Sequence, residues 1–326
     1  MDNSINFSSV PPPTVRAHLP NYSSDMLQIL GEKMDKLEDW GVLVKPEDIG
    51  VVPEFVVPSM LMPKPEKGEW RLVTDFTPLN IHIKKLETVA PTIQEAKDKL
   101  AKFKFHIQLD LSNYFYQGGM KVEDCQYLAT PHPFKGIRVY ACEPQGLRNA
   151  SEHAYERLAR IYGDLCAQEK MTRMADGLYV LGDTLEDLDA NFREVLSRAR
   201  LCGMTFKPSK VVVAPVNTVL FGWQKVGDGW RPTTHTVSPL TTVDPPTTVK
   251  KLRSWLGSYK QLTECIPEYA VILAPLEEIV GGRGSAERIT WTEELLKAFT
   301  KAKASLQKIN TVFVPKPSDT LHTFSD

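Results

Sequence analysis

Two aspartates, Asp110 and Asp176, stand where the chain could present carboxylates to a metal ion. Asp110 lies near the end of the stretch 105–111, in which apolar and polar residues alternate strictly, as in a half-buried strand. Asp176 precedes Gly177, and Asp-Gly is a dipeptide typical of the turn between two hairpin strands. A carboxylate at a strand end is either a turn former or a metal ligand. The alternation alone leaves both interpretations open.

Carboxylates from separate strands can together hold a pair of Mg²⁺ ions about 3.5–4 Å apart. Phosphoryl-transfer enzymes use such a pair to stabilise the attacking and leaving oxygens. Asp110 and Asp176 are far apart in sequence, so only the fold can bring them together. An Asp-Gly turn also suits a hairpin in any protein. The hypothesis of a metal site therefore requires further support.

The amino-acid composition is that of a globular protein without an overall attraction to polyanions. Charged residues make up 24% of the 326 and apolar residues 42%, which is the balance of a globular chain. A net charge of −1 gives no overall attraction to nucleic acid, so a polyanion would have to bind local basic clusters. Basic clusters occur at 64–71, 97–104, 207–210 and 250–253. Each of them taken alone is also typical of a solvated helix face.

The cysteines and the apolar runs indicate the compartment. Five cysteines are scattered without a C-x-x-C pair, which favours reduced thiols and argues against a zinc site or disulfide scaffold. We find no signal peptide and no apolar run near the ~20 residues of a membrane span. We therefore expect an intracellular protein, in a cytoplasmic particle or the nucleus, with no membrane partner.

Periodicity and capping signals predict interleaved strands and helices followed by a mostly helical part. Asp25 is the expected cap of the first helix, and Thr92 with Glu95 forms a capping box. The Pro-, Thr- and Ser-rich segment 232–248 is expected to be a linker or a domain edge. The principal predicted elements are strands at 70–76 and 105–111, a hairpin at 171–181 with its turn at Asp176-Gly177, and helices at 151–167, 184–203, 249–262 and 293–308.

Several motifs occur together in one order. They are 69–76, 79–80, 109–120, 144–150, 174–177, 220–223, 245–257, 274–276 and 291–299. In this order they resemble a reverse transcriptase, most closely those of gypsy-type long-terminal-repeat retrotransposons. The resemblance covers nearly the whole chain from about residue 42.

The resemblance implies an α+β right-hand polymerase with fingers, palm and thumb. Its antiparallel palm sheet would be backed by helices, and its C-terminal part would be mostly helical. We assign residues 1–24 to a flexible leader and 25–231 to fingers and palm. Residues 232–285 would form the thumb, and 286–326 a connection segment with the first strand of a truncated ribonuclease H domain. Asp326 would be the opening carboxylate of that domain.

The resemblance also implies a catalytic centre. Asp110 and Asp176 would be catalytic and would bind two Mg²⁺ ions, with Mn²⁺ as a possible substitute and the Leu111 carbonyl as an auxiliary ligand. The resemblance assigns Lys210 to leaving-group assistance. The nucleotide would be bound by Lys64, Arg71, Phe115, Gln145 and Gly146. Of these, Phe115 would reject a sugar with a 2′-hydroxyl.

Nucleic acid would bind elsewhere on the chain. The resemblance assigns primer positioning to Leu220, Phe221, Gly222 and Trp223, and backbone contacts with the template and primer to Lys250, Lys251 and Arg253. Simpler interpretations stay open for some of these residues. Phe115 and Trp223 could be packing residues, and Lys64 and Lys210 could be ordinary surface residues.

The hairpin departs from the family pattern, which is Tyr-x-Asp-Asp, whereas this chain has Met174-Ala175-Asp176-Gly177. The second carboxylate is therefore lost. Asp183 is not expected to replace it, because it lies seven residues beyond Asp176, or roughly 20 Å away along a strand. The cost could be about 10²–10³ in rate. Glu143, Arg148 and Glu152 also replace apolar or small residues of the family.

We expect template-directed DNA synthesis from deoxynucleoside triphosphates, on an RNA or DNA template with a DNA primer. The alternative is a catalytically inactive, nucleic-acid-binding remnant with the same fold. The sequence does not predict the oligomeric state. It does suggest that the chain is a piece of a longer retroelement polyprotein.

Overall fold

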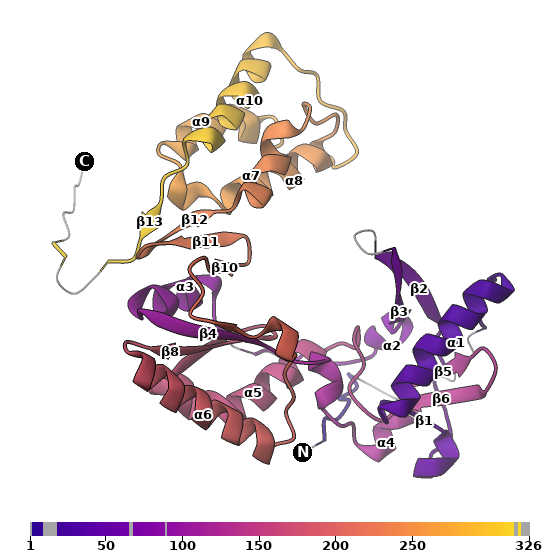
Figure 1. Cartoon of the computed structure of the whole chain (residues 1–326). Coiled ribbons are helices and arrows are strands. Elements are labelled where there is room, and N and C mark those ends of the chain that lie inside the picture. The colour runs from indigo at the N-terminus through magenta and orange to yellow at the C-terminus, as the bar shows by residue number, and fades with distance from the viewer. Residues whose placement is uncertain (1, 9–17, 65–67, 89, 316–318, 321–326) are drawn as a thin grey trace. The chain divides into compact units, whose positions relative to one another are not determined.

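The computed structural model describes residues 2–8, 18–64, 68–88, 90–315 and 319–320. The chain forms two compact units (Figure 1). Unit 1 comprises residues 1–91, 108–180 and 189–212, and unit 2 comprises 92–107, 181–188 and 213–326. The expected ribonuclease H strand at 321–326, with Asp326, lies outside the described residues. Within the described ranges, no helix combines the length and apolarity that crossing a bilayer requires.

Unit 1 begins with helix α1 (Ser24–Asp39), which buries Leu30, Met34 and Leu37. Its N-cap is Ser23, whose side chain accepts from the Met26 N–H, and not the expected Asp25. Two antiparallel arrangements follow: the sheet β1-β6-β5 and the hairpin β2-β3. Their bounds are β1 Leu43–Val44, β2 Ser59–Lys64, β3 Glu69–Thr74, β5 Ala129–His132 and β6 Gly136–Tyr140, with short helices α2 Thr77–Asn80 and α4 Val122–Cys125.

The first residues of the chain pair with this unit. Asn3 forms a parallel bridge with Met120, and the Ile5 N–H donates to Asp124 at 2.9 Å. Phe7 packs edge-on against Tyr127, with ring centroids 4.9 Å apart. Residues 2–8, which the sequence analysis groups with a flexible leader, therefore contribute to the core.

A second sheet has the strand order β7-β8-β4-β9. The bounds are β4 Phe105–Asp110, β7 Met171–Met174, β8 Gly177–Gly182 and β9 Val212–Val213. Helices α5 (Ala150–Ala167) and α6 (Leu185–Leu201) belong to the same region, and α5 packs against β7. The alternating stretch that begins at Phe105 thus forms a strand ending at Asp110, as predicted.

The hairpin β7-β8 differs by one residue from the prediction. Met174 pairs with Gly177, so the two tip residues are Ala175 and Asp176. Ala175 has a φ of 52°, in the left-handed region that favours glycine. The Asp-Gly dipeptide correctly predicted a hairpin at this place. The cross-strand pairing with Met174 makes Gly177 the first residue of β8 and not a turn residue.

Unit 2 contains the antiparallel sheet β10-β11-β12-β13 and most of the remaining helices. The strands are β10 Val219–Leu220, β11 Trp223–Val226, β12 Gly229–Pro232 and β13 Val312–Phe313, and the helices are α3 Ile93–Lys102, α7 Thr234–Thr242, α8 Val249–Lys260, α9 Tyr269–Glu278 and α10 Glu293–Ser305. The predicted capping box at Thr92 is present. The segment 232–248, expected to be a linker or a domain edge, contains the helix α7, which Thr233 caps and in which Leu240 is buried.

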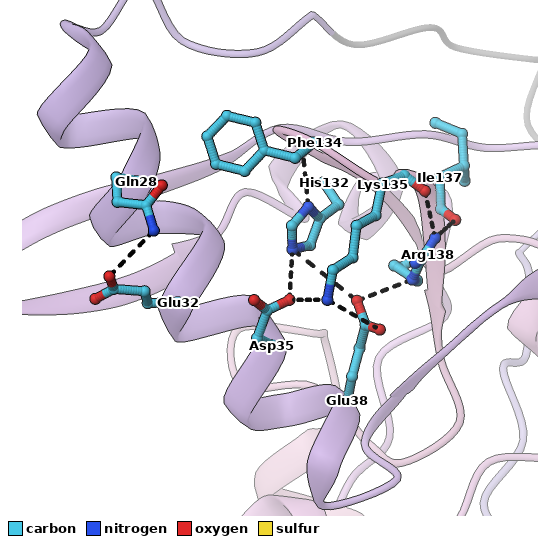
Figure 2. Close-up of polar contacts among 9 residues, drawn as sticks. All are labelled: Gln28, Glu32, Asp35, Glu38, His132, Phe134, Lys135, Ile137 and Arg138. Atoms are coloured by element: carbon cyan, nitrogen blue, oxygen red, sulfur yellow. Dashed lines mark hydrogen bonds and ion pairs between the residues drawn. The ribbon is translucent and has the colours of Figure 1, made fainter.

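A charged cluster holds α1 to the β5-β6 hairpin (Figure 2). Asp35 and Glu38 lie on one face of α1. His132 Nε2 lies 3.0 Å from Asp35 Oδ1, and Arg138 Nε donates to Glu38 at 2.9 Å. The side chain of Arg138 is only 6% exposed, so Glu38 compensates a largely buried charge.

We predict that Glu38→Gln lowers the free energy of unfolding by about 2 kcal/mol, because it weakens a charged hydrogen bond to a buried guanidinium. Glu32→Gln is the matched control on the same helix, since Glu32 pairs with Gln28 at the exposed surface. We expect that control to change stability by less than about 0.5 kcal/mol. Urea unfolding measures both values, and equal losses would contradict a stabilising role for the cluster.

Candidate functional site

The end of β4 lies beside the tip of the β7-β8 hairpin. The Leu111 N–H donates to the Asp176 carbonyl at 3.2 Å, and Leu111 also forms an antiparallel bridge with Phe206. The backbone thus brings together two segments that are remote in sequence, each with one of the two candidate carboxylates. The Leu111 carbonyl belongs to the same junction.

Asp110 is largely buried and has two cationic neighbours. Lys210 Nζ lies 2.6 Å from its Oδ2 and Lys207 Nζ lies 3.5 Å away, while the side chain is 13% exposed. Burial would raise the pKa of Asp110, but the lysines outweigh burial and hold it below its usual range. Asp110 is therefore ionised at neutral pH, with its charge offset by the two ammonium groups.

The donor set fits a hard divalent cation. Asp110 and Asp176 offer carboxylate oxygens and Leu111 offers a carbonyl, which are the ligands that Mg²⁺ prefers. Asp110 Oδ2 is buried, and its neighbour is the Lys210 ammonium 2.6 Å away. If a cation displaced Lys210, the negative charge of this buried oxygen would have to be neutralised by that cation.

A cavity of about 440 Å³ opens beside Asp176. Phe115 contributes to its wall from the 3₁₀ turn Tyr114–Gln117, and Glu152 contributes from α5. The Gln117 side-chain amide stabilises that turn through two hydrogen bonds: it accepts one from the Thr205 N–H and donates one to the Thr205 carbonyl. Phe115 and Asp176 thus line one cavity with mostly apolar walls.

Tyr179 is a neighbour of the site that the sequence analysis did not identify. A Cβ atom added at Gly177 would lie 3.2 Å from the Tyr179 hydroxyl and 3.3 Å from the Met174 carbonyl. Residues two apart on a strand share one face, so the sequence signal was available in the 177/179 spacing. Burial raises the pKa of Tyr179 to about 12, and the charges of Asp176 and Asp110 add to that effect.

The other nucleotide-site candidates of unit 1 are mostly exposed. Lys64 and Arg71 lie on the β2-β3 hairpin, where Lys64 pairs with Glu69 at 3.8 Å. Gln145 is exposed, and Gly146 accepts a hydrogen bond from Asn80 at 2.9 Å. Among the described residues, no hydrogen bond or ion pair joins any of these four to Asp110.

Two of the family departures have structural explanations. Glu143 is fully buried and accepts from Asn3 at 2.7 Å, and it lies 2.6 Å from His153 Nδ1. Arg148 donates to the carbonyls of Asn80 and Ile83. Both side chains therefore serve the packing of unit 1 rather than the candidate site.

In unit 2, the primer-positioning candidates divide into buried and exposed residues. Leu220 and Trp223 are buried, and the Lys97 ammonium lies 3.9 Å from the centre of the Trp223 ring. Phe221 is 55% exposed, with a φ of 46°. Gly222 has a φ of 83°, and a Cβ there would meet Thr236 Oγ1 at 2.4 Å. The exposed group at this turn is thus the Phe221 ring.

The basic candidates of α8 also differ from one another. Arg253 donates to the carbonyls of Val280 and Arg283, at 2.7 and 2.8 Å, so its guanidinium closes the turn after α9. Lys250 and Lys251 are exposed. Arg253 is exposed as well, but its hydrogen bonds within the chain hold the guanidinium, so the two lysines are better placed for contacts with an external anion.

The cluster of Figure 2 contains the ligand types of a metal site, but its protonation argues against one. Ligand atoms of Asp35, Glu38 and His132 lie within 4.8 Å of one another. However, the Phe134 N–H donates to His132 Nδ1 at 3.1 Å, so the ring proton is on Nε2 and faces Asp35. A metal would need the lone pair of that nitrogen, and Lys135 already contacts Asp35.

Comparison with known proteins identifies relatives. The family model described as "Reverse transcriptase (RNA-dependent DNA polymerase)" matches residues 62–240. The chain is 24% identical over 317 residues to the retrovirus-related Pol polyprotein from transposon opus of Drosophila melanogaster, which covers 94% of this chain and 31% of that protein. It is 23% identical over 249 residues to the transposon Tf2-3 polyprotein of Schizosaccharomyces pombe, covering 76% of this chain and 18% of that protein.

The chain thus spans about a third or less of the length of these relatives. Its fold is similar to that of a foamy viral protease-reverse transcriptase solved in complex with double-stranded DNA. The TM-score is 0.81 at 19% identity, over 96% of this chain and 53% of that chain. This likeness confirms the expected fold class, an α+β polymerase fold.

We predict that Gly222→Ala lowers the free energy of unfolding by about 1–3 kcal/mol, because the new methyl group meets Thr236 and the positive φ becomes strained. The matched control is Gly257→Ala on α8, where a Cβ has open space. That control should stabilise the helix by up to about 1 kcal/mol. Thermal unfolding tests the pair, and a neutral Gly222→Ala would contradict the described turn.

Proposed function

The chain belongs to the reverse transcriptase family, and from this premise we propose that it carries out template-directed DNA synthesis. A primer 3′-hydroxyl would attack the α-phosphate of a deoxynucleoside triphosphate and release pyrophosphate. The observation that carries the proposal is the Leu111–Asp176 hydrogen bond, which joins the two carboxylate segments beside a cavity lined by Phe115.

Asp110, Asp176 and the Leu111 carbonyl would hold the divalent cations, two Mg²⁺ ions or Mn²⁺ in their place. When bound, such ions favour ionisation of the attacking hydroxyl and stabilise charge on the phosphates. Because Asp110 is ionised and buried, it needs no proton loss before it binds a cation. The Phe115 ring, by its bulk, would exclude a sugar that carries a 2′-hydroxyl.

Cationic side chains would neutralise the negative charges of the phosphates. Lys64 and Arg71 would contact the triphosphate, and the Arg71 guanidinium could bind phosphate oxygens in pairs. Gln145 and Gly146 would pack on the incoming nucleotide. Lys210 lies close enough to Asp110 to protonate a departing pyrophosphate once a cation has displaced it from the carboxylate.

Nucleic acid would be held by the exposed groups of unit 2. Lys250 and Lys251 would contact backbone phosphates, and the turn 220–223 would position the primer end. In this proposal residues 25–231 supply fingers and palm, 232–285 the thumb and 286–326 a connection segment. The source would be a gypsy-type long-terminal-repeat polyprotein. The five cysteines are all free thiols, which fits an intracellular location.

One observation favours a second candidate function. Position 177 carries no carboxylate, and Lys207 and Lys210 already offset the charge of Asp110. A chain with this site could retain nucleic-acid binding without polymerisation. Salt-sensitive binding of a duplex, with no Mg²⁺-dependent primer extension, would support this remnant over the polymerase.

Our test of the polymerase is primer extension on an RNA template. We predict that Asp110→Asn abolishes extension, because it removes an ionised ligand, and that Gly177→Asp raises it by up to about 10²–10³-fold, because it restores charge near the cations. Asp183→Asn is the matched control, since Asp183 is exposed and lies beyond the end of β8. Extension that persists in Asp110→Asn would refute the site.

A binding measurement tests the role of Lys210. We predict that Lys210→Met tightens Mn²⁺ binding by roughly five- to tenfold, because it removes a cation that competes for Asp110 at a partly screened distance. Lys121→Met, at an exposed lysine paired with Glu123, should leave the affinity unchanged. Electron paramagnetic resonance of free Mn²⁺ gives both constants. Weaker binding in Lys210→Met would show that the lysine does not compete.

A further inference from the structure

The space beside Gly177 is occupied by Tyr179. The ideal Cβ position at residue 177 lies 3.2 Å from the Tyr179 hydroxyl and 3.3 Å from its Cε2, both closer than ordinary van der Waals contact. Tyr179 is 4% exposed, so its phenol is held by its surroundings. A carboxylate at position 177 would begin in this space. The glycine therefore lets the phenol approach the hairpin tip.

The phenol also lies within electrostatic reach of both remaining carboxylates. Burial, followed by the charges of Asp176 and Asp110, raises the pKa of Tyr179 to about 12. The hydroxyl is therefore protonated at every physiological pH. A neutral hydroxyl can donate one hydrogen bond and accept others, which suits it to orient a water or an alcohol beside two anions.

We infer that the Tyr179 hydroxyl is a positioning group of the candidate site and replaces part of the function of the carboxylate that Gly177 lacks. It would hydrogen-bond a water or the primer hydroxyl held between Asp110 and Asp176. The inference rests on the proposed function and adds a residue to it.

Other nearby groups are less suited to this role. Lys207 and Lys210 are cations that pair with Asp110, so they compete with a divalent ion and do not support one. Tyr114 lines the cavity, but after burial the charges that most affect its pKa are those of Arg157 and Arg173. The Tyr179 hydroxyl, by contrast, lies 3.2 Å from the position that a Cβ atom of residue 177 would occupy.

The experiment compares four full-length proteins: the parent, Tyr179→Phe, Gly177→Asp and the double variant. Mn²⁺ affinity is measured by electron paramagnetic resonance, and kcat and KM by primer extension. In the parent background, we expect Tyr179→Phe to weaken Mn²⁺ binding and to lower kcat at least threefold, with KM for the nucleotide unchanged. In the Gly177→Asp background the same substitution should change either quantity less than 1.5-fold.

Tyr162→Phe is the matched control, because Tyr162 is a fully buried tyrosine of α5 that plays no part in the site. It should leave Mn²⁺ affinity and kcat unchanged. A second variant, Gly177→Ala, tests the same point without altering the phenol. Its methyl group presses on the Tyr179 hydroxyl, so Mn²⁺ binding should weaken here too.

Two results would overturn the inference: equal effects of Tyr179→Phe in both backgrounds, which indicate a purely structural role, or no effect in either. Unchanged Mn²⁺ affinity in Gly177→Ala would count against it in the same way. The failures are distinguishable. If Gly177→Asp extends primers and Tyr179→Phe has no effect, the proposed function stands alone. If no variant extends a primer, Mn²⁺ affinities still decide the role of Tyr179.

Discussion

The candidate site depends on one backbone hydrogen bond, from the Leu111 N–H to the Asp176 carbonyl. The two segments that this bond joins each carry a candidate carboxylate, and like charges on neighbouring segments repel, so the junction needs an opposing attraction. The hydrogen bond fixes the strand end against the hairpin tip without involving either side chain. Lys207 and Lys210 then offset the charge of Asp110. The segments of the two candidate ligands are thus joined through the backbone, while lysine side chains supply the countercharge.

Local signals predicted the elements that local physics determines. The alternation of residues 105–111 gave β4, and Thr92 with Glu95 gave the start of α3. The motif order gave the family and the fold class. The junction of Leu111 with Asp176 could not be derived from spacing, because it joins segments through tertiary structure. The same reason explains the one-residue shift of the hairpin tip and the helix α7 in a Pro- and Thr-rich segment.

The departures from the family pattern are of two kinds. Glu143 and Arg148 find internal partners, and their polar atoms are satisfied within unit 1. Such substitutions change how the unit packs and leave the candidate ligands untouched. Gly177 differs, because it removes charge at the hairpin and opens space that Tyr179 fills. Sequence comparison alone counts these changes equally, whereas the structure separates them by what each side chain contacts.

The two hydrogen bonds of Arg253 bear on how α8 would respond to ionic strength. Each phosphate neutralised on a duplex releases condensed counterions, so the logarithm of affinity falls with that of salt by about 0.9 per contact. A guanidinium that donates to neutral carbonyls keeps its positive charge, but the bonded nitrogen cannot at the same time contact a phosphate. The direct phosphate contacts of the helix would then come mainly from Lys250 and Lys251, with a salt dependence shallower than three fully engaged basic residues would produce.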